Sequence, residues 1–189
     1  STFRPEEFSL QDGTVTYTGS QYTVSQGVDV SDWQNEIRWQ EVAQSGIDFS
    51  VIRCGYRSYG IGELRIDPRF EENYAGAGAA GLRRGVYFFS QATTVDEVDD
   101  EIFFFMKILG DTELTMPIVL DWERVGVETA RTNNVDAETL TAMQKHFCKT
   151  MVDFGYTPMV YFNWHLAESS LYLSELEDYP FWLALYQNY

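Results

Sequence analysis

Six short apolar runs, separated by segments with helical periodicity, are the feature that most restricts the fold of this chain. The runs cover residues 27–31, 49–54, 85–89, 117–123, 158–163 and 181–185. Nearly continuous apolar runs of this length are typical of strands that are buried on both faces of a sheet. Strands that alternate with helices predict a parallel sheet with the helices packed outside it. We therefore expect an α/β fold.

The segments between the runs carry start and stop signals for helices. Asp67 and Pro68 predict an N-cap and a first helical position, and Gly81 predicts the end of that helix. Thr94 and Glu97 have the spacing of a capping box, so a second long helix is expected to begin there.

A third helix is expected between Asp136, as its N-cap, and Gly155, which follows its end. Its apolar side is predicted to comprise Leu140, Met143, Phe147, Met151 and Phe154. A weaker helical pattern covers residues 35–44.

The alternation fits either an open doubly wound sheet or a barrel. No glycine-rich phosphate loop follows the first run, which weakens the nucleotide-binding version of the open sheet. We favour a modified TIM-like β/α barrel. A complete eight-stranded barrel needs more chain than follows Phe181, so this barrel is expected to lack its last strands.

Residues 1–26 differ from the rest of the chain and predict a leader or linker. They are rich in Ser, Thr, Gln and Gly and show neither strand alternation nor a helical period. Residues 27–189 are long and apolar enough for one domain, at 44% hydrophobic residues in the whole chain. No apolar run approaches the roughly 20 residues of a membrane span, and no signal peptide opens the sequence.

Charge and rare residue types exclude several classes of function. The net charge of -16 repels nucleic acid and anionic membrane surfaces. Cys54 and Cys148 are predicted to be buried free thiols. The two histidines, His146 and His165, lack zinc-type spacing, so neither a metal nor a cofactor is expected. Oligomeric state is left open by the sequence.

Asp121 and Glu123, at the end of the fourth run, are the sharpest candidates for catalysis. Side chains alternate along a strand, so both point the same way, roughly 6–7 Å apart along the backbone. In a parallel barrel, the carboxyl ends of the strands form the active face. Two crowded carboxylates repel one another, and one should hold its proton to higher pH. Glycosidic bond cleavage needs such a pair, although a metal ligand pair or an exposed strand end is the alternative.

Asp29 is a third candidate because it lies inside the first apolar run. A buried carboxylate is costly unless it is paired or useful. The alternative is that Asp29 caps a turn, but Asp32 is the better candidate for a cap.

Several segments match a known family in the same order. They are 27–34 (GVDVSDWQ), Trp39, 49–53, 67–73 with its Asp-x-x-Phe-x-x-Asn pattern, 85–89, 117–123 (PIVLDWE), 161–163 and 182–186. From Gly27 to Tyr186 the chain resembles the lysozymes of glycoside hydrolase family 25.

The resemblance implies a modified β/α barrel that cleaves the β-1,4 bond between N-acetylmuramic acid and N-acetylglucosamine in peptidoglycan. It implies that Glu123 is the general acid, that Asp121 orients the substrate's acetamido group or the reactive water, and that Asp29 stabilises positive charge on the sugar ring. Whether a carboxylate or the acetamido oxygen attacks is left open. The family's domain normally continues beyond residue 189, with two more strands. An extracellular or cell-surface location follows from the substrate.

Aromatic side chains near the strand ends fit sugar binding, because flat apolar sugar faces stack on rings. The candidates are Tyr87, Phe89, Tyr161, Trp182 and Tyr186, with Asn163 as a donor to a sugar hydroxyl, and Tyr56, Arg57 and Tyr59 as further lining residues. The polar segment 124–134 is expected to form a wall on the same face, and Trp33 is expected in the core.

Two other functions compete with the muramidase. One is a non-catalytic peptidoglycan or glycan-binding module, which needs the aromatic cleft but not the carboxylates. The other is a chitinase-like glycosidase, which carries a longer acidic run on its catalytic strand. Residues 117–120 contain no acidic side chain, which argues against the chitinase.

Overall fold

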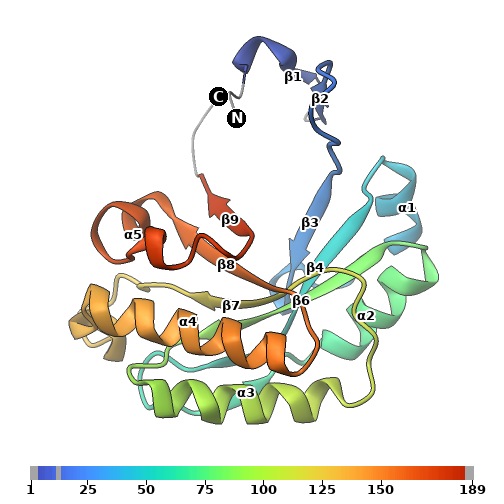
Figure 1. The fold of residues 1–189 in the computed structure, drawn as a ribbon. Helices are drawn as coiled ribbons and strands as arrows, with labels where there is room; N and C mark the ends of the chain where they lie inside the picture. Colours follow the sequence, from blue (N-terminus) through green and yellow to red (C-terminus); the bar gives the residue numbers. More distant parts are fainter. Residues whose placement is uncertain (1–3, 12–13, 186–189) are drawn as a thin grey trace.

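The computed structural model describes residues 4–11 and 14–185, and its centre is a curled, largely parallel sheet. The strands follow one another in the order β3 (Gly27–Val30), β4 (Phe49–Arg57), β6 (Arg83–Ser90), β7 (Ile118–Trp122), β8 (Pro158–Asn163) and β9 (Phe181–Ala184), and β5 (Leu64–Ile66) pairs antiparallel with β4. Each of the six apolar runs forms a strand. The sheet curls into a half-barrel (Figure 1), so the predicted α/β barrel-like fold is confirmed.

Helices cover one face of this sheet. They are α1 (Trp39–Gln44), α2 (Phe70–Ala79), α3 (Val95–Leu109), α4 (Ala137–Asp153) and α5 (Trp164–Ser169), with the short 3-10 helices η1 (Pro5–Glu7), η2 (Asp32–Gln34), η3 (Arg131–Asn134) and η4 (Leu173–Glu175). Figure 1 shows α2, α3 and α4 along the outer face of the half-barrel. None of the helices in the described part of the chain is long and apolar enough to cross a membrane.

The starts of α3 and α4 follow the predicted caps. The Thr94 hydroxyl accepts a hydrogen bond from the Glu97 N–H at 3.2 Å, and Asp136 accepts one from the Thr139 N–H at 2.8 Å. Phe154 is a correction: it follows the end of α4 and is 56% exposed, because the helix ends before its side chain can join the apolar side.

The start of α2 also differs from the prediction. This helix begins at Phe70, and Asp67 is not its N-cap. Asp67 is buried, and its Oδ2 accepts a hydrogen bond from the Nε of Arg53 at 2.8 Å while its Oδ1 accepts one from the Arg69 N–H at 2.9 Å. Its carboxylate therefore holds the turn at Pro68 and Arg69, which leads into the helix one residue later.

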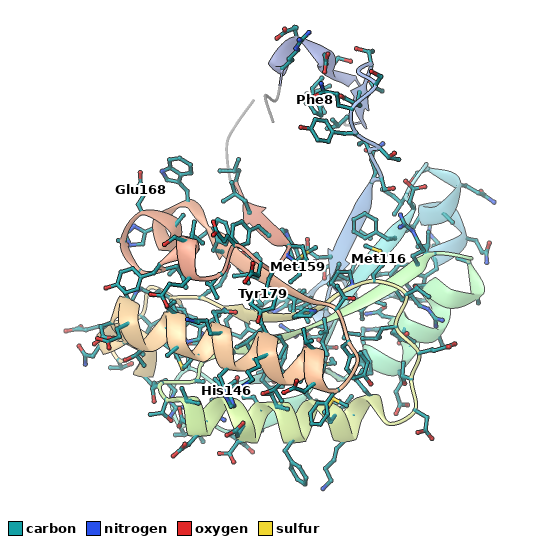
Figure 2. The ribbon with its side chains drawn as sticks, viewed as in Figure 1. Phe8, Met116, His146, Met159, Glu168 and Tyr179 are labelled. Carbon is teal, nitrogen blue, oxygen red and sulfur yellow. The ribbon has the colours of Figure 1, made fainter. Side chains whose placement is uncertain are left out.

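Regular structure also occurs before residue 27, where the sequence indicates no strand. β1 (Phe8–Gln11) and β2 (Thr14–Tyr17) pair antiparallel with each other. Phe8 and Tyr17 lie directly opposite, and their ring centroids are 4.8 Å apart, which stabilises the pair. Figures 1 and 2 show this hairpin, with Phe8 on it, apart from the sheet. That residues 1–26 serve as a leader or linker stays a prediction.

The two faces of the sheet have different side chains. Ile52, Val86 and Ile118 face the helices and join the main core, which includes the stacked rings of Phe105 and Phe147. The inner face carries a smaller cluster of Val51, Tyr87, Val119 and Tyr161. In Figure 2, Met116 and Met159 lie near the open inner side, whereas His146 lies where α4 packs on α3, and it pairs with Asp99. Cys54 and Cys148 are buried and unpaired, as predicted.

A β-bulge at Cys54 changes the direction of the side chains along β4. Arg53 pairs in register with Tyr87, and the next pair joins Gly55 to Phe88, so Cys54 is the extra residue. Arg53 therefore faces the interior with Tyr87. Arg57, four residues on, faces the helices instead.

Candidate active site

Asp29, Asp121 and Glu123 meet at one cavity on the inner side of the sheet. The cavity has a volume of about 380 Å³. Its lining comprises Asp29, Arg53, Tyr87, Phe89, Asp121, Glu123, Tyr161 and residues 182–185. Asp121 is the fourth residue of β7 and Glu123 follows the strand directly, so the alternation of the strand puts both carboxylates on the inner side. The structure thus brings together the three carboxylates that the sequence singles out.

Asp121 is the carboxyl group whose protonation the site perturbs most. Burial raises its pKa well above the usual range, and the negative charges of Glu123 and Asp29 raise it further. Its Oδ1 atom is buried and has no hydrogen-bond partner among residues 4–11 and 14–185. The positive charge of Arg53 acts in the opposite direction. Asp121 is therefore a carboxyl that retains its proton to a higher pH than an isolated aspartate.

Glu123 is held at both its carboxylate and its backbone. The hydroxyl of Tyr161 donates a hydrogen bond to Oε1 of Glu123. The buried side-chain amide of Gln91 donates to the backbone carbonyl of Glu123 at 2.7 Å and to that of Ser90 at 2.9 Å. These contacts fix the direction of the Glu123 side chain at the end of β7.

Asp29 and Tyr87 also line the cavity, with Tyr87 buried and Asp29 exposed. The expectation that Asp29 is buried is wrong, because β3 is the edge strand of the sheet. Partial burial of its carboxyl group still raises the pKa of Asp29 above that of an ordinary aspartate. Burial also raises the pKa of the Tyr87 hydroxyl, and the nearby charge of Asp121 adds to the effect. Tyr87 therefore stays a neutral hydrogen-bonding group in the presence of these carboxylates.

The predicted aromatic residues of the cavity differ in how deeply their rings are buried. Tyr87 and Tyr161 are 8% and 5% exposed. Trp182 meets both edge-on, with centroid distances of 6.5 Å to Tyr87 and 5.1 Å to Tyr161. The hydroxyl of Tyr161, and not its ring face, contacts a carboxylate. Phe89 is half-buried and lines the cavity, so Phe89 and Trp182 are the rings best placed to meet a sugar.

Other predicted lining residues lie outside the described cavity lining. Asn163 caps α5, because its Oδ1 accepts a hydrogen bond from the Leu166 N–H at 3.0 Å. The ring of Tyr56 lies over Arg53, with the guanidinium carbon 5.0 Å from the ring centroid. Tyr186 falls outside the described residues.

Two expectations near the site are wrong. Arg57 does not line the cavity, because it is buried against α3, where its Nε donates to Glu101 at 2.7 Å. Trp33 is not in the core, since it is 79% exposed. The chain turns into η2 at Ser31, whose hydroxyl accepts from the Trp33 N–H, and this turn directs the indole outward.

The segment after Glu123 is tied down by its own arginine. Arg124 donates to the backbone carbonyls of Thr132 at 2.6 Å and Val135 at 2.7 Å. The N–H of Arg131 donates to the carbonyl of Tyr59 at 3.1 Å, which joins this segment to the turn after β4. The two segments follow the carboxyl ends of β4 and β7, at the end of the sheet where Glu123 lies.

Arg53 lines the cavity although the sequence analysis gave it no role. It is 8% exposed and is the single cation among the described residues that line the cavity. A signal for it existed, because a lone arginine inside an apolar run must find a buried partner or bear a large desolvation cost.

Comparison with known proteins identifies the family. The pattern that defines glycosyl hydrolases family 25 matches residues 28–189. The chain therefore belongs to this family, and the resemblance seen in the sequence is confirmed.

Individual relatives agree with this assignment. An uncharacterized protein of Escherichia coli O157:H7, YegX, is 29% identical over 166 residues, which cover 87% of this chain and 57% of the relative. Lysozyme M1 of Streptomyces globisporus is 34% identical over 100 residues, which cover 52% of this chain and 32% of the relative. The chain thus spans little more than half the length of the first of these proteins.

A solved structure agrees on the fold. The modular autolysin LytC of Streptococcus pneumoniae superposes with a TM-score of 0.76 at 20% identity, and the match covers 96% of this chain and 44% of LytC. At this level of identity, the similarity shows a shared half-barrel fold.

Proposed function

We propose that this chain is the catalytic part of a muramidase that cleaves the β-1,4 bond between N-acetylmuramic acid and N-acetylglucosamine in peptidoglycan. The observation that carries the proposal is the meeting of Asp29, Asp121 and Glu123 in one cavity at the end of β7. Family membership supports it, as does the similarity to a protein named as a lysozyme. The similar autolysin LytC has been solved in complex with a synthetic peptidoglycan ligand.

In this proposal, Glu123 is the general acid that protonates the glycosidic oxygen. Its carboxylate lines the cavity, and the Tyr161 hydroxyl fixes its direction. The Asp121–Glu123 pair resists losing both protons, because each negative charge disfavours the other. The pair can thus keep one proton available at a pH where an isolated carboxyl has lost its own.

Asp121 and Asp29 act on the sugar that develops positive charge. Asp121 has a buried oxygen that no described residue hydrogen-bonds, which is suited to a polar N–H of the substrate's acetamido group. Asp29, at the opposite edge of the sheet, supplies negative charge that stabilises an oxocarbenium-like ring. Phe89 and Trp182 provide apolar surface for the sugar face. Because peptidoglycan lies outside the membrane, we place the activity at the cell surface or outside the cell.

The test is clearing of purified bacterial cell walls, with release of reducing sugar ends, by the parent chain and by Glu123→Gln. We expect the substitution to lower the rate by at least about 100-fold, because the amide cannot donate the required proton. Glu128→Gln is the matched control: it lies on the exposed segment five residues on, and we expect parental activity.

Mass spectrometry of the released fragments then identifies the bond. N-acetylmuramic acid at the new reducing end supports a muramidase, whereas N-acetylglucosamine there contradicts it. Equal clearing by Glu123→Gln would refute the proposed role of Glu123. Binding to cell walls without cleavage by the parent would favour a glycan-binding module instead.

A further inference from the structure

Arg53 places one positive charge in the lining of the cavity that also contains Asp29, Asp121 and Glu123. It extends from the middle of β4, and the bulge at Cys54 leaves it level with Tyr87 on the inner side of the sheet. Asp29 lies on the strand to one side of β4, and Asp121 lies on the second strand to the other side. The site therefore has a cation at its centre.

The guanidinium is fixed by two carboxylates outside the cavity lining. Its Nε donates to Oδ2 of Asp67 at 2.8 Å, and its Nη2 binds Oδ1 of Asp32. Asp67 is itself fixed, because its oxygens accept hydrogen bonds from the backbone N–H groups of Asp32 at 3.1 Å and Arg69 at 2.9 Å. The Asp67 N–H donates to the carbonyl of Cys54 at 3.0 Å, so the bulge residue next to Arg53 also positions the partner of Arg53.

The charged and titratable groups around Arg53 come from every packed element. They are Asp29 on β3, Asp32 on η2, Tyr56 on β4, Asp67 before α2, Tyr87 on β6 and Asp121 on β7. Arg53 is the cation common to this group. Burial and the negative charges of Glu123 and Asp29 favour the neutral form of Asp121, and the positive charge of Arg53 favours its ionised form.

We propose that Arg53 is a positioning residue for the cleft: its guanidinium, locked by Asp67 and Asp32, holds a positive charge in the cavity lining that favours the ionised form of Asp121. The role rests on the proposed glycosidase function, because it concerns the carboxylates assigned there. Arg53 acts through those groups and needs no contact with the sugar. Its two-point anchoring keeps the charge in one place whether or not substrate is bound.

The test is a carbon-13 NMR titration of the aspartate carboxyl groups in the folded protein without substrate, with the Asp121 signal assigned from Asp121→Asn. In Arg53→Met, we expect the titration midpoint of Asp121 to rise by about one pH unit, because the ionised form of Asp121 loses the positive charge that stabilises it. Arg53→Lys keeps the charge and should stay nearer the parent. If Arg53→Met does not fold because Asp67 is left unpaired, Arg53→Met/Asp67→Asn replaces both members of the pair.

The matched control is Arg57→Met/Glu101→Gln, which removes the buried pair on the helix side of the same strand. It should leave the Asp121 midpoint in place. An unchanged midpoint in the folded Arg53 variants would overturn the proposal, as would a lysine variant indistinguishable from methionine. Because no turnover is measured, an inactive parent would refute the proposed function without touching this result. In an active parent, the pH profile of kcat/KM should move upward with the Asp121 midpoint.

Discussion

Two buried arginines on β4, Arg53 and Arg57, form ion pairs of the same kind in opposite surroundings. Both are nearly inaccessible, at 8% and 5% exposure, and each has a buried carboxylate partner, Asp67 or Glu101. Arg53 borders the cavity that contains the carboxylates, whereas Arg57 lies under α3. The pairs therefore share their chemistry but differ in what lies beyond them.

The partners of the two arginines show how the surroundings decide the outcome. Asp67 accepts two backbone hydrogen bonds besides its bond to Arg53, so both of its carboxylate oxygens have partners. Glu101 has an Oε2 atom with no hydrogen-bond partner in the described part of the chain, and burial raises the pKa of its carboxyl to about 7 despite Arg57. The Arg53–Asp67 pair thus borders the cleft with its carboxylate fully hydrogen-bonded, whereas the carboxyl of the Arg57–Glu101 pair titrates near neutral pH.

The largest expected effect is on stability at pH 8. Arg57→Met should lower the free energy of unfolding by about 3–5 kcal/mol, because Glu101 stays buried without its charged partner and must either bear an unpaired charge or take up a proton at pH 8. Arg53→Met should cost less, about 1–3 kcal/mol, because backbone N–H groups still bind Asp67. Urea denaturation followed by circular dichroism measures both. Equal costs would show that the hydrogen bonds to Asp67 do not distinguish the pairs.

The pH dependence of stability sharpens the comparison. The pKa of Glu101 is about 7 in the folded protein against an ordinary value of 4.5, so the folded state binds its proton more strongly. Its contribution is complete below pH 4.5 and is lost as the pH rises through 7, by at most about 3 kcal/mol. Glu101→Gln should make the decline in unfolding free energy shallower across this window.

Asp100→Asn, on the exposed side of α3, is the control for that experiment and should keep the parental slope. Chemical denaturation at closely spaced pH values between 4 and 8 provides the measurement. A parental slope in Glu101→Gln would assign the decline to other carboxyl groups, such as Asp121.

The smallest expected effects on stability come from ion pairs that are partly exposed. Arg131 binds Glu97 with both side chains partly exposed, and Arg131→Ala should cost about 1 kcal/mol or less. Amide hydrogen exchange should quicken in residues 124–135, because this ion pair ties that segment to α3. Arg65→Ala, which removes a half-exposed pair with Glu63, should change stability by under about 0.5 kcal/mol. A larger loss from Arg65→Ala than from Arg131→Ala would contradict the ranking by burial.

The sequence was most informative where hydrophobic patterning decides the structure. The six apolar runs became the six main strands. The inner strands β4, β6, β7 and β8 are largely buried, whereas the edge strands β3 and β9 are partly exposed. β5 was missed because it has only three residues, two of them exposed. The pairing of β1 with β2 depends on contacts such as Phe8 with Tyr17, which no periodic pattern reveals.

The candidate site was predictable where residues alternate regularly, and unpredictable where the register changes. Asp121 and Glu123 followed from simple alternation on β7. The opposite directions of Arg53 and Arg57 could not be derived without the bulge, since an even spacing places two side chains on one face. Gly55 was the available signal, because a Cβ there would lie 2.6 Å from the Arg65 carbonyl oxygen, and glycine within a strand often marks a bulge.

The bulge also affects how this strand can change during evolution. Deletion of one residue elsewhere in β4 would move each side chain that follows it to the opposite face of the sheet, from the cleft side to the helix side or the reverse. Loss of the Cys54 codon would instead leave Arg53 paired with Tyr87 and Gly55 paired with Phe88, so the two sides would be preserved. What would disappear is the carbonyl that holds Asp67. A deletion at Cys54 thus keeps the other side chains of β4 on their own sides of the sheet, but removes the carbonyl that holds Asp67, the partner of Arg53.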